Sequence, residues 1–427
     1  MKINEFFEML DSGNFDERLK AVYGNDEKTL ERQKNRYKEA VSKFSKTYPH
    51  HTEIEIFSAP GRTEIGGNHT DHQHGCVLAA AVDVDIIGVV AFHDGGVIRI
   101  LSEGYDEISV KTSETDICKG DGGSVAITRG ILSKFKEEGI DIAGFDMYAV
   151  SDVLSGSGIS SSAAFETLIG TVMDKHYNDG RLGAVEIAKI GQFAENVYFG
   201  KKSGLMDQMV SSVGGFVFID FENPQKPVVK SCEFDFEKSG YCLFITDTKG
   251  SHADLTDDYV AITEEMREVA ACFGKDVMRQ VDRTEFFEKL PDLREKCSDR
   301  AILRAIHFLG DNERAWLEFS ALEHGDVSKF LALVNESGES SKGLLQNLYS
   351  SKKPKNQEIP LALEISRRIV GEKGAVRVHG GGFAGTIQAF VPVELAKEYQ
   401  KQMDNLFGEG SSRLMKIRPY GGIVVIK

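Results

Sequence analysis

The chain has little of what marks a membrane protein, a disulfide-stabilised protein or a zinc protein. Its 427 residues include six cysteines, and none of these forms a Cys-x-x-Cys pair. Scattered thiols of this kind are typical of a reduced cytoplasmic protein and argue against a disulfide framework or a zinc knuckle. No apolar run approaches the roughly 20 residues that a membrane-spanning helix needs, and the N-terminal segment lacks an apolar signal core. We therefore expect a cytoplasmic protein without a membrane partner.

Positive charge is also scarce. The 51 Lys and Arg residues are outnumbered by 66 Asp and Glu residues, so the formal net charge is -15. Proteins that bind nucleic acid need basic surfaces to neutralise the phosphate backbone, and this balance argues against that class of partner. The length is sufficient for two ordinary domains, each with its own core.

A loop of small residues at 154–164 is the most informative stretch of the sequence. It reads Leu-Ser-Gly-Ser-Gly-Ile-Ser-Ser-Ser-Ala-Ala, between an apolar strand-like segment (145–150) and a predicted helix over 163–175. Glycines let the backbone approach a ligand closely, and a helix start offers unpaired N–H groups with a positive dipole end. A flexible linker is the alternative, but linkers rarely follow an apolar strand. The pattern predicts phosphate binding, with serine hydroxyls as donors or as a Mg²⁺ ligand.

The loop matches neither of the two common phosphate-binding patterns. No lysine follows the glycines, so the P-loop pattern is absent. Gly156 and Gly158 are followed by Ser161 where the dinucleotide-binding fingerprint needs a third glycine.

A second polar segment, residues 59–75, lies between two predicted strands at 53–59 and 77–92. We expect it to form a loop that carries glycines, a guanidinium, a carboxylate and several imidazoles. Such a loop can hydrogen-bond many hydroxyl groups, as sugar recognition requires. Two alternatives remain, a solvated surface loop and a metal site of a hydrolase. The possible ligands of that metal are His69, Asp71, His72 and His74.

Two further stretches carry candidate residues. Glu195, on a predicted helix over 183–199, is followed twelve residues later by Asp207 in a Met-Asp-Gln sequence. Three consecutive glycines, Gly380 to Gly382, precede a predicted strand at 386–391. Such a run indicates that the backbone must approach another group closely, and a tight turn is the structural alternative.

The remaining pattern mixes strands and helices and predicts an α+β protein with two lobes. Further helices are expected at 125–138, between 259 and 334 and near 361–371, and a last strand is expected at 413–427. We expect a helical extension over residues 1–50, a first domain over 51–230 and a second domain over 231–427.

In order and spacing, these motifs resemble those of the galactokinase family of the GHMP kinase superfamily. Residues 158–163 are similar to the second GHMP motif, and residues 380–385 are similar to the third, Gly-Gly-Gly-Phe-Gly-Gly. Residues 61–72 resemble the galactokinase signature Gly-Arg-x-Asn-x-Ile-Gly-Glu-His-x-Asp-Tyr. The resemblance covers about residues 30–427. It implies a two-lobed fold, with an N-terminal lobe like domain 2 of ribosomal protein S5 and a ferredoxin-like C-terminal lobe.

The resemblance also implies an activity and a set of site residues. The activity is that of an ATP-dependent sugar 1-kinase, with D-galactose, ATP and Mg²⁺ as partners, in a monomer or weak homo-oligomer. Asp207 and Arg62 would act at the sugar O1 hydroxyl, and Ser162 and Glu195 would hold Mg²⁺. The sugar would be bound by Asn68, His69, Asp71, Gly204 and Tyr259. The nucleotide would be bound by Gly156, Ser157, Gly158, Ser160, Ser161, Ser162, Gly381 and Gly382.

The signature departs from the family pattern at several positions. Glu64 replaces the usual Asn, Gly66 replaces Ile, Asn68 replaces Glu and His72 replaces Tyr. The resemblance assigns the Glu at the place of Asn68 to the sugar C6 hydroxyl. Because an amide does not repel a carboxylate, a uronic acid such as galacturonate is an alternative substrate. A non-catalytic sugar-binding regulator is a further alternative, although Ser162, Glu195 and Asp207 are all present.

Overall fold

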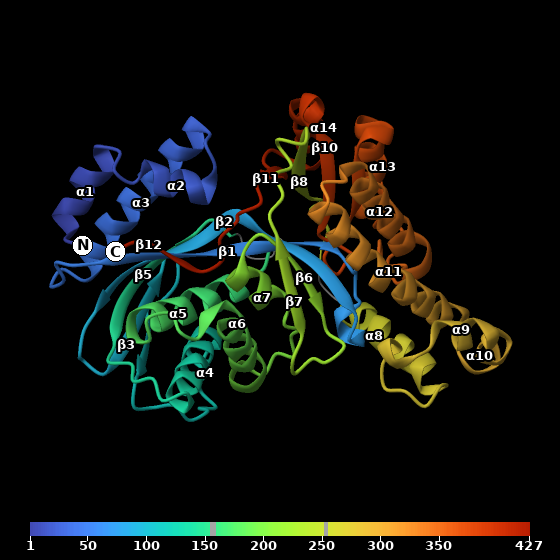
Figure 1. Cartoon of the computed structure of the whole chain (residues 1–427), viewed down its shortest axis with the longest axis horizontal. Helices are drawn as coiled ribbons and strands as arrows, with labels where there is room; N and C mark the ends of the chain where they lie inside the picture. The colour runs from blue at the N-terminus through green and yellow to red at the C-terminus, as the bar shows by residue number, and fades with distance from the viewer. Residues whose placement is uncertain (154–158, 252–254) are drawn as a thin grey trace.

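The structure, a computed structural model, describes residues 1–153, 159–251 and 255–427. Within these residues two β-sheets form the scaffold, and helices cover both faces of the first (Figure 1). The first sheet has the order β12-β1-β2-β5-β3-β4, with β6 and β7 added through β2. Its strands are β1 (Glu55–Gly66), β2 (Cys76–Phe92), β3 (Val97–Ser102), β4 (Ile108–Lys111), β5 (Phe145–Ser151), β6 (Phe216–Asp220), β7 (Val228–Cys232) and β12 (Ile423–Ile426).

Three N-terminal helices cover one face of this sheet. They are α1 (Ile3–Asp11), α2 (Asp16–Tyr23) and α3 (Glu27–Thr47). The Asp26 side chain caps α3 by accepting a hydrogen bond from the backbone N–H of Thr29. Apolar side chains of these helices pack on the strands, with Phe6 and Phe44 among the fully buried residues. Burial of this apolar surface holds the helical extension on the sheet.

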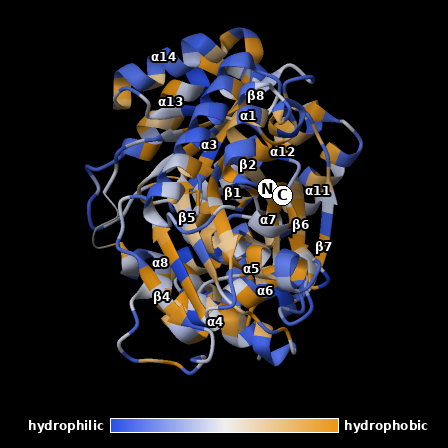
Figure 2. Cartoon of the chain, turned by 90° about the vertical axis from the view of Figure 1, so that its left-hand side faces the viewer, coloured by the Kyte–Doolittle hydropathy of each residue, from blue (hydrophilic) through white to orange (hydrophobic). Residues whose placement is uncertain are grey.

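Another set of helices covers the opposite face. These elements are α4 (Gly123–Glu137), α5 (Ser161–Tyr177), α6 (Gly183–Phe193), the π-helical turn η2 (Ala194–Phe199) and α7 (Met206–Val213). Hydrophobic residues concentrate on the strands between the two helical layers (Figure 2). The starts of α5 and α7, together with the end of β1, carry the residues of the candidate site.

The second lobe is built on a four-stranded antiparallel sheet in the order β11-β8-β10-β9. Its strands are β8 (Tyr241–Asp247), β9 (Ala375–His379), β10 (Thr386–Pro392) and β11 (Ser412–Met415). The helices that follow β8 are α8 (Thr256–Ala271), α9 (Arg283–Glu288), α10 (Leu290–Lys296), α11 (Asp299–Glu323), α12 (Val327–Ser340), α13 (Glu358–Val370) and α14 (Ala396–Phe407). Short helical turns are η1 (Asp71–Gln73), η3 (Met278–Gln280), η4 (Ser341–Leu345), η5 (Gly371–Lys373) and η6 (Val393–Leu395).

Two sequence expectations need correction. Half of the signature is not a loop, because β1 continues through Gly66 and pairs with β2 as far as Leu78. The expected strand at 413–427 is two strands, β11 in the second sheet and β12 in the first. Pro419 has no backbone N–H to donate, and the backbone at Gly421 packs closely against Ser212. The segment between β11 and β12 therefore does not form the regular backbone hydrogen bonds of a β-strand.

A fully buried carboxylate, Asp85, joins the helical extension, the first sheet and the segment before β12. It accepts hydrogen bonds from the Tyr23 hydroxyl at 2.6 Å, from Arg36 at 2.6 Å and from Arg418 at 2.9 Å. The Ser58 hydroxyl donates to the same carboxylate. Burial alone would raise the pKa of Asp85, but the two guanidinium groups outweigh it and hold the pKa below 3.8.

None of the helices in residues 1–153, 159–251 and 255–427 combines the length and the apolar character that a membrane crossing requires.

Candidate active site

The centre of the candidate site is an ion pair between Arg62 on β1 and Asp207 in the first turn of α7. The Arg62 Nε donates to Asp207 Oδ1 at 2.6 Å and one terminal nitrogen donates to Oδ2 at 2.8 Å. Ser160, directly before α5, donates its hydroxyl to Oδ2 at 2.6 Å. The predicted catalytic pair and one predicted nucleotide-binding serine are therefore in direct contact.

Asp207 combines an ionised carboxylate with access from solvent. Burial raises the pKa of this carboxyl, but the charge of Arg62 and the hydrogen bonds from Arg62 and Ser160 outweigh it and lower the pKa below 3.8. A carboxylate can accept about four hydrogen bonds, and side chains in the described part of the chain supply three of them. The side chain is 29% exposed, so a substrate hydroxyl can reach it.

Asp71 approaches the same region from η1. Its Oδ1 accepts the backbone N–H of His72 at 2.9 Å. Its Oδ2 lies only 2.8 Å from where a β-carbon on residue 204 would stand. Gly204, three residues before Asp207, therefore lets the carboxylate of Asp71 approach the backbone that leads into α7.

Asn68 is completely buried, and its amide is saturated by protein groups. The side-chain nitrogen donates to Glu64 at 2.9 Å and to the carbonyl oxygen of Gly380 at 2.8 Å. The side-chain oxygen accepts from Asn347 at 2.8 Å and from Ser341 at 3.3 Å. Asn68 thus connects the signature to the glycine-rich segment, to the first residue of η4 and to the segment after η4.

Glu64, at the signature position where the family has Asn, carries the carboxylate that position 68 lacks. It pairs with the fully buried Arg377 at 2.9 Å. Burial raises the pKa of Glu64 to about 7, although Arg377 and the amide of Asn68 both lower it. Compared with the family pattern, Glu and Asn are exchanged between positions 64 and 68. The carboxylate therefore lies beside the buried guanidinium of Arg377.

The glycine-rich segment is held by two ring side chains. His69, with a positive φ of 58°, bonds through Nε2 to the carbonyl oxygen of Gly381 at 2.9 Å. The Tyr259 hydroxyl donates to the carbonyl oxygen of Gly382 at 2.9 Å. A β-carbon on Gly381 would lie 2.6 Å from the Tyr259 ring, and one on Gly382 would lie 2.2 Å from the carbonyl oxygen of Asn347. Close approach to protein groups thus accounts for these two glycines.

Burial lowers the pKa of His69 to about 4. The imidazole is therefore neutral at physiological pH, and its Nε2 carries the hydrogen that is donated to Gly381.

The predicted phosphate loop is described only in part. Gly156, Ser157 and Gly158 lie outside the described residues. Ser161 and Ser162 form the first turn of α5, and both side chains are half-buried.

Glu195, the second predicted Mg²⁺ ligand, lies in a buried polar cluster behind the start of α5. It accepts hydrogen bonds from Lys201 at 2.7 Å, from Ser203 at 2.5 Å and from Gln208 at 3.0 Å. Gln208 also donates to Glu166, at 2.9 Å. Glu166 is one helical turn after Ser162, so Ser162 and Glu195 approach this cluster from two elements.

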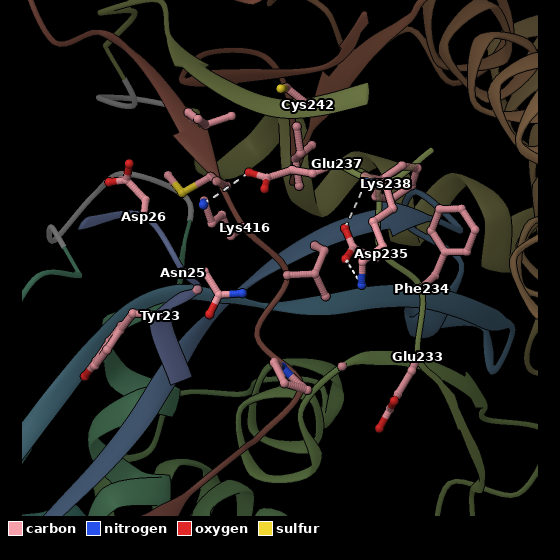
Figure 3. A pocket seen from close by; sticks show the side chains of 18 of the residues that line it. Tyr23, Asn25, Asp26, Glu233, Phe234, Asp235, Glu237, Lys238, Cys242 and Lys416 are labelled. Atoms are coloured by element: carbon pink, nitrogen blue, oxygen red, sulfur yellow. Dashed lines mark hydrogen bonds and ion pairs between the residues drawn. The ribbon is translucent and has the colours of Figure 1, made fainter. Parts of the chain in front are cut away.

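A cavity of about 1000 Å³ lies apart from these residues, between α2, residues 232–238 and residues 414–419 (Figure 3). Its side chains carry mixed charge, and Lys416 pairs with Glu237 at 3.2 Å across it. None of the predicted site residues within the described part of the chain lines this cavity.

Comparisons with known proteins decide the family. The sequence model "Galactokinase galactose-binding signature" matches residues 42–92, and "GHMP kinases N terminal domain" matches residues 126–215. A galactokinase from Actinobacillus pleuropneumoniae serotype 5b is 30% identical over 378 residues, which are 85% of this chain and 94% of the relative. This chain belongs to the galactokinase family. A second relative, a galactokinase from Glaesserella parasuis, is 29% identical over 376 residues, 84% of this chain and 93% of its own.

Solved structures confirm the predicted GHMP kinase fold. A galactokinase from Lactococcus lactis, solved with galactose, superposes with a TM-score of 0.75 at 24% identity, over 90% of this chain and 98% of its own. A mevalonate kinase from Methanococcus jannaschii superposes with a TM-score of 0.55 at 16% identity, over 86% of this chain and 98% of its own. This galactokinase-family chain therefore has the fold that galactokinase and mevalonate kinase share.

Several buried residues around the site were not predicted. They are Gln208, Asn347, Arg377 and Asp311, the last of which accepts the backbone N–H of Asn68 at 2.7 Å. Gln208 directly follows Asp207 in the Met-Asp-Gln sequence, which is the signal that could have indicated it. The other three residues are far from the signature in sequence and carry no spacing signal. Asn347, Arg377 and Asp311 contact positions 64 and 68 of this galactokinase-family chain. The departure of these two positions from the family signature was the sequence sign that the residues around them differ as well.

Proposed function

We propose that this chain is a cytoplasmic ATP-dependent sugar 1-kinase that transfers the γ-phosphoryl group of ATP to O1 of D-galactose. The observation that carries the proposal is the contact between Asp207 and Ser160. It joins a carboxylate suited to orient a hydroxyl to the N-terminal end of α5, where phosphate would bind. The relatives named galactokinase, which the chain matches over most of its length, support the choice of sugar.

In this proposal Asp207 orients the acceptor hydroxyl. With its pKa held below 3.8 the carboxylate is a weak base, but it accepts a hydrogen bond from O1–H and directs the oxygen lone pair toward the phosphoryl group. Phosphoryl transfer proceeds through a loose transition state, so positioning and charge neutralisation contribute more than proton abstraction. Arg62 holds the carboxylate by two hydrogen bonds and adds positive charge beside the transferred group.

The other residues would bind the remainder of the two substrates. Asp71 would accept hydrogen bonds from the ring hydroxyls, with Gly204 leaving room for its approach, and Tyr259 and His69 would border the sugar. Asn68 would act on the C6 end through the contacts that hold Gly380. We propose Gly156, Ser157, Gly158, Ser160, Ser161, Ser162, Gly381 and Gly382 for the nucleotide.

Mg²⁺ fits the cluster around Glu195. Carboxylate and hydroxyl oxygens are the donors that this ion prefers, and it keeps several water molecules beside one or two protein ligands. The buried oxygens Glu166 Oε1 and Gln208 Oε1 have no hydrogen-bond partner within the described part of the chain. We propose that Glu195 and Ser162 hold the ion, which when bound would neutralise the charge of the phosphates. Lys201, more than half exposed, would turn away from Glu195.

The decisive experiment is an ATP-consumption assay with Mg²⁺ and a panel of acceptors. Galactose, galacturonate, arabinose, glucose and N-acetylgalactosamine are compared with mevalonate and homoserine. We expect galactose 1-phosphate as product, with no turnover of the two controls. Sugar binding without turnover of any sugar would instead establish a regulator, and zinc-dependent activity without ATP would establish a hydrolase.

A kinase for a sugar with a charged C6 group, such as galacturonate, is the second candidate. The observation in its favour is that the signature carboxylate is at position 64 in this chain instead of at position 68. Position 68 carries a neutral amide, while Glu64 is paired with Arg377 in the interior. A substrate carboxylate at C6 would therefore meet no unpaired negative charge from these two positions.

The double exchange Glu64→Asn with Asn68→Glu tests this candidate, because it restores the family pattern at both positions. If the exchange governs the C6 end, the ratio of kcat/KM for galactose over galacturonate rises at least tenfold in the double variant. The single variant Glu64→Gln, which keeps Asn68, is the control and should leave the ratio within about twofold. An unchanged ratio in a folded double variant would remove the C6 assignment.

A further inference from the structure

Three histidines and one aspartate meet at an end of the first sheet that is not part of the candidate active site. His50 and His51 follow α3, His93 follows β2, and Asp146 is on β5. The Nε2 atoms of all three rings point to the Asp146 carboxylate, at 3.6 Å for His50, 2.7 Å for His51 and 3.3 Å for His93. The Asp146 side chain is fully buried, whereas that of His50 is 58% exposed and opens the cluster to solvent.

The hydrogen bonds show which of these groups hold the Asp146 carboxylate in place. Arg99 donates to both oxygens of Asp146, at 2.6 and 2.7 Å. The backbone N–H of Gly95 donates to Nδ1 of His93 at 3.0 Å, so Nε2 of His93 must carry the hydrogen and donate to Oδ1. Oδ1 thus has two donors. Oδ2 has Arg99 and His51, with His50 close to it.

We propose that His50, His51 and Asp146 form a binding site for a divalent transition-metal ion, with Zn²⁺ the best match. The ligand atoms of these three residues lie within 4.8 Å of one another. Zinc bonds of about 2.0–2.2 Å put tetrahedral ligand atoms roughly 3.3 Å apart, so a small opening of the His51–Asp146 contact admits the ion. Imidazole nitrogens and one carboxylate oxygen favour zinc or its neighbours over Mg²⁺.

The protons and charges of the cluster agree with this assignment. Each neutral imidazole can move its hydrogen from Nε2 to Nδ1, through solvent, and bind the ion through Nε2. Water would complete four ligands. The positive charge of Arg99 is paired with Asp146 itself, and Glu107, which accepts a hydrogen bond from Tyr48 at 2.7 Å, adds a further negative charge to the surroundings of Arg99. His93 and Arg99 would then be positioning residues for Asp146.

Such an ion would connect the end of α3 to β5. Because α3 belongs to the N-terminal helices, metal binding would stabilise the attachment of this layer to the sheet. The proposal is independent of the kinase reaction, and it concerns different residues from the signature histidines.

The test is a titration of the tag-free, chelator-treated chain with Co²⁺ and then Zn²⁺, in the absence of ATP. We expect a visible Co²⁺ absorption band that saturates at one ion per chain and is abolished by Zn²⁺ but not by Mg²⁺. His50→Ala and His51→Ala should each weaken binding at least tenfold. His324→Ala, which changes an exposed histidine elsewhere, should leave it unchanged.

A second readout guards against loss of folding in the variants. Zn²⁺ should raise the Tm of the unaltered chain and of His324→Ala, but not that of His50→Ala, whose Tm without metal should equal that of the unaltered chain. Binding that is absent in the unaltered chain, or equal in all variants, would overturn the proposal. Loss of binding in His72→Ala with retention in His50→Ala would also overturn it, because the ion would then lie in the signature.

Discussion

Asp207→Asn is expected to lower kcat for sugar phosphorylation by about 10²- to 10³-fold, the range typical of losing one preorganised electrostatic contact to a reacting group. The amide keeps the shape of the side chain but removes the charge that Arg62 and Ser160 hold in place. One carboxylate oxygen is replaced by an NH₂ group, which is a donor. This group cannot accept a hydrogen bond from the Arg62 guanidinium or from the substrate hydroxyl. KM for ATP should change little, since the change is at the acceptor. The measurement is steady-state kinetics with galactose and ATP as the varied substrates.

The control is Asp11→Asn, the same chemical change at an exposed ion pair with Lys38. It should leave kcat unchanged, because this pair lies on the helical extension. The Tm of Asp207→Asn should remain within a few degrees of the unaltered chain, as its site is open to solvent. A kcat within threefold of the unaltered chain would show that Asp207 does not orient the acceptor.

Asp85→Asn is expected to cost about 3–5 kcal/mol of unfolding free energy, as loss of one partner does in a buried ion pair. The change leaves Arg36 and Arg418 buried without their shared counter-charge. Denaturant-induced unfolding at pH 7 measures the difference. Asp11→Asn is the matched control, since Asp11 pairs with Lys38 at an exposed position and should contribute no more than about 1 kcal/mol.

The pH dependence of stability gives an independent check on Asp85. Its pKa is lower in the folded state than the ordinary 3.8, so its contribution is complete above pH 4 to 5 and is lost as pH falls through the folded-state value. Asp85→Asn should therefore lose stability less steeply on acidification. A variant whose difference from the unaltered chain stays constant from pH 7 to pH 3 would contradict the assignment.

The helices around the site could be predicted because their sequences carry local signals. The helix after the serine loop was expected over 163–175 and is observed as α5 over Ser161–Tyr177. The signature was expected as a loop because Arg62, Glu64 and the glycines are unusual in a strand. Pairing with β2 on one side and the second lobe on the other satisfies these groups, and no local pattern encodes such tertiary contacts.

The sequence indicated which residues belong to the candidate site better than it indicated which of them contact one another. Arg62 and Asp207 were expected to act together at the sugar O1 and Ser160 to bind the nucleotide, and the structure brings the three side chains into direct contact. The partners of Asn68 could not be expected, because Gly380 and Asn347 lie about 280 to 312 residues away in sequence. A substitution within a motif indicates that a neighbour has changed, and only the fold identifies that neighbour.

The return of β12 to the first sheet has a consequence for how the chain reaches its native state. β1 pairs with β12 through Ile56 and Phe57, and Asp85 receives Arg418 from the segment just before it. During synthesis, the first sheet therefore exposes one unpaired edge and one incompletely neutralised carboxylate until almost the whole described chain has emerged. Completion of the N-terminal lobe therefore depends on residues that follow the second lobe in the chain, which couples the folding of the two lobes.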